Sequence, residues 1–113
     1  MATKKYIATK VYAQGCTVCE HMSRIDKPTF EGFPEIGYQE IDLDKIIDNE
    51  GNATKLRLYQ LIERHALNND YTVDTPLYML MTNQGKYLGH HTGEATIVQL
   101  RELITKILSE ADG

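Results

Sequence analysis

The chain contains two cysteines, Cys16 and Cys19, with two residues between them. A disulfide between them would close so short a loop that it would add little to the stability of the fold. Thiols at this spacing can instead exchange electrons with another disulfide, because the second thiol can displace a partner that the first has bound. In a cytosolic protein, a Cys-x-x-Cys pair near a strand–helix–strand pattern is typical of this redox chemistry.

The flanking sequence predicts that the cysteine pair lies where a strand gives way to a helix. Residues Lys5–Tyr12 are rich in β-forming types and predict a strand. From Cys16 to about Asp26 the pattern predicts a helix, with Cys19 and Met22 on one face. The free N–H groups and dipole of a helix start favour an anion at the first thiol, while the second is shielded inside the first turn. We therefore predict that Cys16 is the attacking nucleophile and Cys19 the resolving thiol.

The rest of the chain predicts three more strands and two more helices. Pro28, Gly32 and Pro34 are expected to end the first helix. The strand–helix–strand opening favours a parallel strand pair, and a later hairpin adds antiparallel strands. The expected fold class is therefore α/β, a mixed sheet covered by helices. The remaining predicted elements are the strands Tyr38–Asp44, Thr75–Thr82 and Lys86–His91 and the helices Ala53–Leu67 and Glu94–Ser109.

Size and composition favour a single domain over residues 1–113. The chain has 113 residues, of which 42% are hydrophobic and 25% charged. These values are typical of a globular domain and argue against wholesale disorder. Twelve Lys and Arg residues against sixteen Asp and Glu residues give a net charge of −4. This balance argues against a nucleic-acid-binding module, which usually has a basic face.

The sequence favours a protein without membrane contact. Its longest wholly apolar run, Leu77–Met81, is far shorter than the roughly 18 residues that a membrane-spanning helix needs. The start of the chain, Met1–Ile7, has two lysines but no apolar stretch long enough for a secretory signal. We therefore expect the protein in the cytoplasm, a reducing compartment.

Around the cysteines the chain resembles the thioredoxin-like family, and the resemblance extends over nearly its whole length. Residues Val11–Cys19 are similar to the family's run of aromatic and Ala residues at a strand end, which leads into Cys-x-x-Cys. Residues Val73–Leu77 resemble the segment that carries the family's cis-proline and precedes its buried strand. Residues Asn83–Lys86 resemble the hairpin turn, and Thr92–Glu94 resemble the glycine-marked start of the last helix.

The resemblance implies a four-stranded mixed sheet flanked by about three helices, and it implies a thiol–disulfide oxidoreductase. It further implies that Pro76 is cis and lies beside the cysteines, where the Thr75 backbone can pair with an incoming peptide as an added strand. Gly93 is expected to complete this substrate-binding region. The implied partners of a monomeric protein are a disulfide-containing protein substrate and a reductant, either a reductase or glutathione. The redox-active disulfide carries the chemistry, so no further cofactor is expected.

Three positions depart from the family's pattern. The intervening pair Thr17-Val18 is neither the Gly-Pro of thioredoxins nor the Pro-Tyr of glutaredoxins, which leaves open a reduction potential that spans roughly −270 to −120 mV across the family. Gly15 stands where thioredoxins have Trp. Lys10 stands where they have a buried Asp. Because lysine is rarely buried, we expect Lys10 to reach for solvent; pointing inward, it would favour a Cys19 thiolate.

Other interpretations of the cysteine pair stay open. The thiols could be inert and buried, or the fold could serve as a binding module, which the atypical Thr17-Val18 pair and the absence of Trp motivate. The segment Leu43–Val73, longer than its thioredoxin counterpart, can shape a partner surface or only decorate the fold. An iron–sulfur cluster shared between subunits, as in some glutaredoxins, is a further alternative. A structural zinc site needs about four ligands, and the remaining candidates are His21, His65, His90 and His91.

Neighbouring polar and apolar residues have a plain structural interpretation. His21 is expected to face solvent, and Met22 is expected to fill the core. A run of acidic residues lies within and just after the second predicted strand, without the glycine placement and spacing of a calcium loop. We expect them to form a solvated face. These acidic residues are Glu40, Asp42, Asp44 and Asp48.

Overall fold

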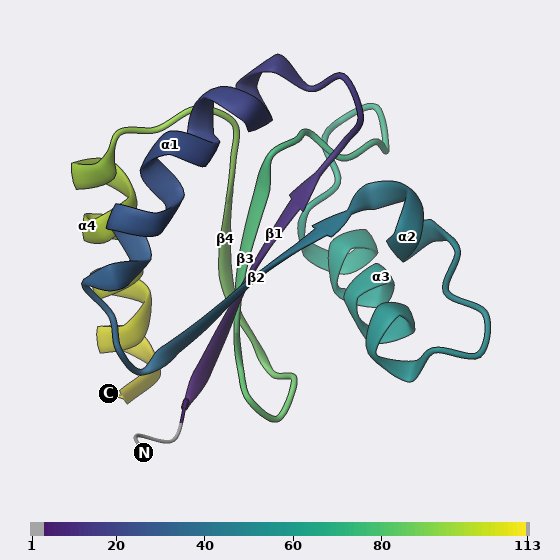
Figure 1. Ribbon diagram of the computed structural model, residues 1–113. Helices are drawn as coiled ribbons and strands as arrows, with labels where there is room; N and C mark the ends of the chain where they lie inside the picture. The colour runs from purple at the N-terminus through teal and green to yellow at the C-terminus, as the bar shows by residue number, and fades with distance from the viewer. Residues whose placement is uncertain (1–3, 113) are drawn as a thin grey trace.

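The chain folds as a sheet of four strands with helices on both faces (Figure 1). This computed structural model describes residues 4–112. Residues 1–3, part of the start that we searched for a secretory signal, lie outside the described residues. The elements in chain order are β1 (Tyr6–Tyr12), α1 (Thr17–Glu31), β2 (Ile36–Asp42), α2 (Leu43–Ile47), α3 (Ala53–His65), β3 (Leu77–Thr82), β4 (Tyr87–Thr92) and α4 (Ile97–Asp112).

The strand order β2-β1-β3-β4 brings three chain segments to one end of the sheet. Strand β1 runs parallel to β2 and antiparallel to β3, and β3 is antiparallel to β4. Val11 lies opposite Leu77, and Leu77 lies opposite Thr92. The segment after β1, the segment before β3 and the segment after β4 therefore meet at the same end. This mixed topology confirms the fold class that the sequence predicts.

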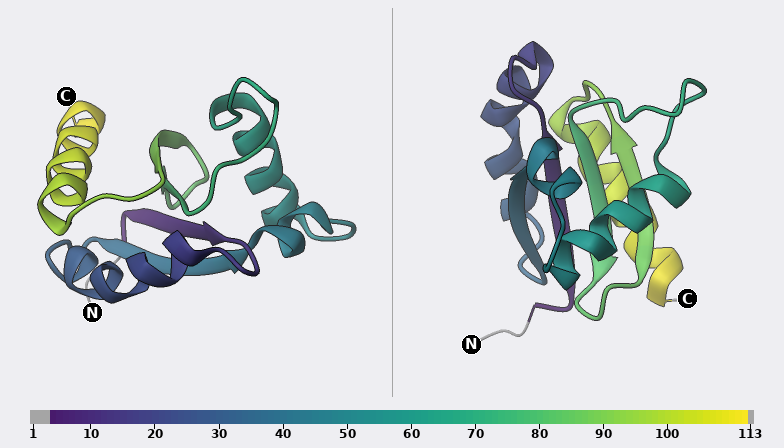
Figure 2. Two further views of the ribbon diagram at one scale, coloured as in Figure 1. Left: turned by 90° about the horizontal axis from the view of Figure 1, so that it is seen from above. Right: turned by 90° about the vertical axis from the view of Figure 1, so that its right-hand side faces the viewer.

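The sheet separates two apolar layers (Figures 1 and 2). Helices α1 and α4 cover one face, and α2 and α3 cover the other. Central strand β3 supplies both layers: Tyr78 and Leu80 pack with α1 and α4, whereas Leu77, Met79 and Met81 pack with α3. A strand buried on both faces reads as a continuous apolar run, which explains why the longest apolar run in the sequence is a strand.

Each long helix buries one side against the sheet. Met22 in α1 is fully buried, as expected for a core residue, and Leu100, Ile104 and Leu108 form a buried stripe along α4. Their spacing of four residues places them on one helical face. Among residues 4–112, no helix has the combination of length and apolarity that a membrane span requires.

Two features of the helices differ from the sequence prediction. Pro28 lies inside α1, which continues to Glu31 instead of ending before the proline. Proline removes one backbone hydrogen bond from a helix interior, but burial of Thr29 and Phe30 holds the last turn against the sheet. The short helix α2 was not predicted. Asp42 is its N-cap residue, and the Asp42 side chain accepts the N–H of Asp44 at 2.9 Å.

Candidate active site

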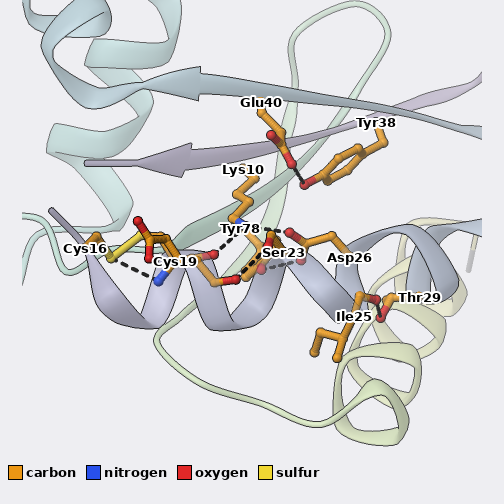
Figure 3. Close-up of polar contacts among 11 residues, drawn as sticks. Lys10, Cys16, Cys19, Ser23, Ile25, Asp26, Thr29, Tyr38, Glu40 and Tyr78 are labelled. Atoms are coloured by element: carbon orange, nitrogen blue, oxygen red, sulfur yellow. Dashed lines mark hydrogen bonds and ion pairs between the residues drawn. A yellow bond between two sulfur atoms is a disulfide. The ribbon is translucent and has the colours of Figure 1, made fainter. Parts of the chain in front are cut away.

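The two cysteines form a disulfide at the start of α1 (Figure 3). Gly15, with φ of 75°, makes the left-handed turn that glycine favours and that leads the chain from β1 into the helix. Cys16 is the N-cap residue, and its sulfur accepts the backbone N–H of Cys19 at 3.1 Å. Cys16 is partly exposed, whereas Cys19 is only 5% exposed. The structure therefore confirms the predicted placement of one accessible and one covered sulfur at a helix start.

The residues expected to bind substrate lie next to Cys16. The peptide bond Thr75-Pro76 is cis, as the resemblance implies. The Thr75 hydroxyl donates to Cys16 Sγ at 3.5 Å. The Gly93 N–H donates to the Pro76 carbonyl at 2.9 Å. These contacts join the three segments that the sheet register brings to one end: Thr75 contacts the disulfide directly, and Gly93 is linked to it through Pro76.

A pocket of about 250 Å³ opens beside the disulfide. The loop between β1 and α1 forms one wall, and both sulfur-bearing residues belong to its lining. Lys10 lines the pocket from strand β1. Glu20 and Glu40 line it with exposed carboxylates. Solvent can therefore approach the cysteine pair from the side of β1 as well as from the substrate side.

Lys10 does not reach for solvent: the residue is 2% exposed, and our prediction for it is wrong. Its ammonium lies 2.5 Å from Asp26 Oδ2 and donates to the Cys19 carbonyl at 3.0 Å (Figure 3). The Tyr78 hydroxyl donates to the other oxygen of Asp26 at 2.5 Å. Residue 10 faces α1 from a central strand, and a buried charge is tolerated there because partners satisfy it.

Two tyrosines near this buried pair are held in the protonated form. Burial, followed by the hydrogen bond to Asp26 and the negative charge of that carboxylate, raises the pKa of Tyr78 above its ordinary value. Burial and the hydrogen bond to Glu40 raise the pKa of Tyr38 in the same way. Tyr78 is therefore a permanent hydrogen-bond donor to Asp26, and it fixes the carboxylate opposite Lys10.

The rim around the disulfide is acidic. Glu20, Asp74 and Glu94 are exposed on the three segments that meet there, and His21, exposed as expected, lies 3.4 Å from Glu94. The segments 11–23, 73–76 and 92–100 contain no Lys or Arg. Hydrogen bonds from Gln14, which lines the pocket, and from the Asp44 backbone lower the pKa of Asp42. A cationic substrate is therefore better matched to this rim than an anionic one.

The structure gives no support to a metal site. Within residues 4–112, no group of three or more His, Cys, Asp and Glu residues could hold a metal ion. The His65 ring instead stacks on Tyr87 with 3.8 Å between ring centroids. His90 Nδ1 shares a hydrogen bond of 2.7 Å with the Tyr87 hydroxyl. Tyr87 itself packs in the apolar layer covered by α3. The two cysteine sulfurs are bonded to each other in a disulfide.

Sequence reasoning missed two members of the site. Asp26 was expected only near the end of the first predicted helix, and Tyr78 only as part of a buried strand. An acidic residue on an otherwise apolar helix face is the signal that could have identified Asp26, because a buried carboxylate requires a partner. The strand that supplies Tyr78 lies 52 residues further along the chain, so no local pattern joins the two.

Comparison with known proteins identifies the class of fold. No family model matches the chain, and no curated protein matches its sequence. Thioredoxin from Fasciola hepatica matches in structure with 20% identity and a TM-score of 0.61, over 92% of this chain and 82% of that one. Thioredoxin from Trypanosoma brucei brucei matches with 19% identity and a TM-score of 0.63, over 96% and 80% of the two chains.

A third solved structure, the malaria parasite thioredoxin-2 described as a component of protein secretion machinery, is 18% identical with a TM-score of 0.61. The match covers 94% of this chain and 86% of that one. The chain therefore has the thioredoxin fold. Its Cys16–Cys19 disulfide lies at the start of the first helix of that fold.

Proposed function

We propose that the protein is a thiol–disulfide oxidoreductase whose reacting groups are Cys16 and Cys19. The observation that carries this proposal is the disulfide itself, which joins a partly exposed sulfur at a helix start to a covered sulfur one turn further on. Because Cys16 is the more accessible sulfur, it attacks the substrate first, and the covered Cys19 sulfur then resolves the mixed disulfide. The thioredoxin fold of the chain agrees with this chemistry.

The reaction needs no group beyond the two thiols and a partner. In the reduced protein the Cys16 thiolate attacks a substrate disulfide, a new S–S bond forms, and the first substrate thiol leaves and takes a proton from solvent. The Cys19 sulfur, after losing its proton, then attacks Cys16 and releases the second substrate thiol. Two electrons have passed to the substrate, and the product is the Cys16–Cys19 disulfide. An external dithiol or two thiols must reduce that disulfide before the next cycle.

The helix start supports the first step. The Cys19 N–H already points at Cys16 Sγ at 3.1 Å, and it would stabilise negative charge on that sulfur. The Thr75 hydroxyl donates to the same sulfur. Thr75, Pro76 and Gly93 then form the surface where an extended substrate peptide would pair with the backbone. A protein disulfide substrate, a reducing partner, a monomeric state and a cytoplasmic location are parts of this proposal.

Reduction of insulin by dithiothreitol tests the proposed function. We expect the wild-type protein to accelerate the reaction and Cys16→Ser to abolish the acceleration. Cys19→Ser should accumulate a mixed disulfide between Cys16 and the substrate, because the resolving thiol is missing. Equal rates for the wild type and Cys16→Ser would end the proposal.

A binding module on the same fold is the second candidate. The observation that favours it is Tyr71, which is 84% exposed with φ of 61° on the loop before Thr75. The Asn68 side chain holds this loop in place, because its Oδ1 accepts the N–H groups of Asp70 and Thr72 at 2.9 and 3.1 Å. A Cys16→Ser/Cys19→Ser variant that keeps the biological activity, together with loss of that activity in Tyr71→Ser, would favour binding over catalysis.

A further inference from the structure

A buried ion pair lies directly behind the resolving cysteine, and the exchange reaction described above does not use it. Lys10 comes from central strand β1 and Asp26 from the buried face of α1. Each side chain is 3% exposed. A pair of opposite charges in such surroundings is costly to desolvate. Because the pair lies beside the redox centre, its charges can act on the sulfurs.

The ion pair has a direction relative to the sulfurs. Its positive end contacts the redox site, because the Lys10 ammonium donates to the Cys19 carbonyl at 3.0 Å (Figure 3). Its negative end lies further along α1, where Asp26 accepts the Tyr78 hydroxyl. The pair is thus a dipole with its cation toward Cys19. Lys10 also lines the pocket that the two cysteines share.

Other charges near the pocket oppose this effect only weakly. Glu20 and Glu40 line the same pocket and carry negative charge. Both residues are exposed, so solvent and salt screen their carboxylates. The ammonium of Lys10 lies in the interior, where the effective dielectric constant is lower and charges interact more strongly. The cationic end of the buried pair is therefore screened less by solvent and salt than these two carboxylates are.

We propose that Lys10, held in place by Asp26, is a positioning residue that favours the reduced form of the Cys16–Cys19 pair. The disulfide is neutral, whereas the reduced pair can carry a thiolate, so a nearby cation stabilises only the reduced form. Two electrons from an external dithiol break the Cys16–Cys19 bond while the donor forms its own disulfide. Two protons leave the donor; one passes to the cysteine sulfur that becomes a thiol, and the other goes to solvent when the second sulfur remains a thiolate.

This inference rests on the proposed function, because it concerns how readily the same cysteine pair accepts electrons. Stabilising the reduced form raises the reduction potential and makes the protein a better acceptor of electrons. An opposite charge at close range changes a thiol ionisation constant by about tenfold to a thousandfold. Because Asp26 cancels part of the field of Lys10, we expect the lower end of this range. The equilibrium constant with dithiothreitol should change about tenfold, which is about 30 mV for two electrons.

A neutral version of the pair provides the test. The variant Lys10→Met/Asp26→Asn removes both charges, and the amide oxygen that it introduces on α1 can still accept the Tyr78 hydroxyl. The matched control is Lys106→Met/Glu102→Gln, which removes one lysine and one carboxylate from exposed positions of α4. The measured quantities are the equilibrium with dithiothreitol from pH 5 to pH 8.5 and the thiolate absorbance of the reduced protein over the same range.

We expect the neutral variant to favour the disulfide about tenfold more than the wild type at pH 8, with its thiolate appearing at higher pH. As the pH is lowered and the thiols of both proteins become protonated, the two equilibrium constants should converge. The control should follow the wild type throughout. Lys10→Glu/Asp26→Lys, with the dipole reversed, should favour the disulfide more than the neutral variant does.

Equal equilibrium constants and equal thiolate titrations for the wild type and the neutral variant would overturn the inference. So would a difference that does not change with pH. If the neutral variant does not fold, the reversed variant Lys10→Glu/Asp26→Lys is compared with the wild type instead. An ion pair with a purely structural role would not make the reduction potential depend on which of the two residues carries the positive charge. These equilibria require no turnover of a protein substrate. Their outcome is therefore separate from loss of insulin reduction in Cys16→Ser, which tests the proposed function alone.

Discussion

The hydroxyl of Thr75 lies 3.5 Å from the sulfur of Cys16, although 59 residues separate them in the chain. The contact exists because β3 is antiparallel to β1, so the segment that precedes β3 lies beside the loop that follows β1. A hydrogen bond from a hydroxyl stabilises a thiolate more than it stabilises a neutral sulfur. Thr75 is therefore placed to stabilise the sulfur after reduction.

Thr75→Val removes this donor and keeps the size of the side chain. We expect Cys16 to react with a disulfide about twofold more slowly at neutral pH. The loss of about 1 kcal/mol from one hydrogen bond lowers the thiolate fraction by up to about fivefold, and the higher nucleophilicity of the more basic thiolate offsets part of this loss. The measurement is the rate of attack on a chromogenic aromatic disulfide as a function of pH. Thr75→Ser keeps the hydroxyl and serves as the control; a Val variant as fast as the Ser variant would contradict the assignment.

Lys10→Met, made without any change at Asp26, leaves a buried carboxylate without its cation. Removing one partner of a buried ion pair typically costs about 3–5 kcal/mol, and we expect a loss of that size in the free energy of unfolding of the oxidised protein. Urea denaturation measures it. Lys10→Met/Asp26→Asn should recover most of the loss, whereas Lys106→Met, at an exposed position, should stay within about 0.5 kcal/mol of the wild type. A stable single variant would show that the pair is weakly coupled.

His90 should make stability depend on pH. Burial, and then the neighbouring His65 and His91, lower the pKa of His90 below its ordinary value of 6.5. The folded protein thus binds this proton less readily than the unfolded chain. The stabilisation is complete above pH 6.5 and is lost as the pH falls through that value toward the lowered pKa.

The Tyr87 hydroxyl contacts His90 Nδ1 at 2.7 Å, so protonation of the ring also removes an acceptor. The difference in unfolding free energy between the wild type and His90→Asn, measured by urea denaturation from pH 5 to pH 8, should rise with pH and then level off. Using the difference cancels the titration of carboxylates that both proteins share. A difference that is constant over this range would refute the prediction.

The acidic rim should select substrates by charge. We expect cystamine, a cationic disulfide, to react faster than the anionic dithiodipropionate after each rate is divided by its rate with free dithiothreitol. The preference should be about tenfold at low ionic strength and should shrink as salt is added. Neutral hydroxyethyl disulfide, as an uncharged reference, should show little dependence on salt.

Removing the charges of the rim tests the cause of this preference. The variant Glu20→Gln/Asp74→Asn/Glu94→Gln should lose most of the preference for cystamine and keep its rate with the neutral disulfide. A control with the same change in net charge neutralises three exposed carboxylates on α3 and α4, namely Glu63, Glu102 and Glu110. If both triple variants behave alike, net charge and not the rim sets the preference.

The strands and helices that position the disulfide follow from local patterns. Strand β1 was predicted from its β-forming residues, and the helix after it from the spacing of Cys19 and Met22 on one face. The structure confirms both elements, and it confirms the cis peptide bond before Pro76 that the family resemblance implies. The end of α1 was misjudged because Pro28 is a strong local signal, whereas burial of Phe30 depends on the sheet below it.

By itself the sequence determined the cysteine pair, its place at a strand–helix boundary and the mixed sheet, because helix spacing and strand alternation act over a few residues. Only the tertiary structure decided the surroundings of the sulfurs. Lys10 is buried because β1 is central and Asp26 faces it from α1 at a separation of 16 residues. The lysine could reach solvent in an isolated strand. Layer packing and strand register supply the partners that keep its charge inside, and no local pattern encodes them.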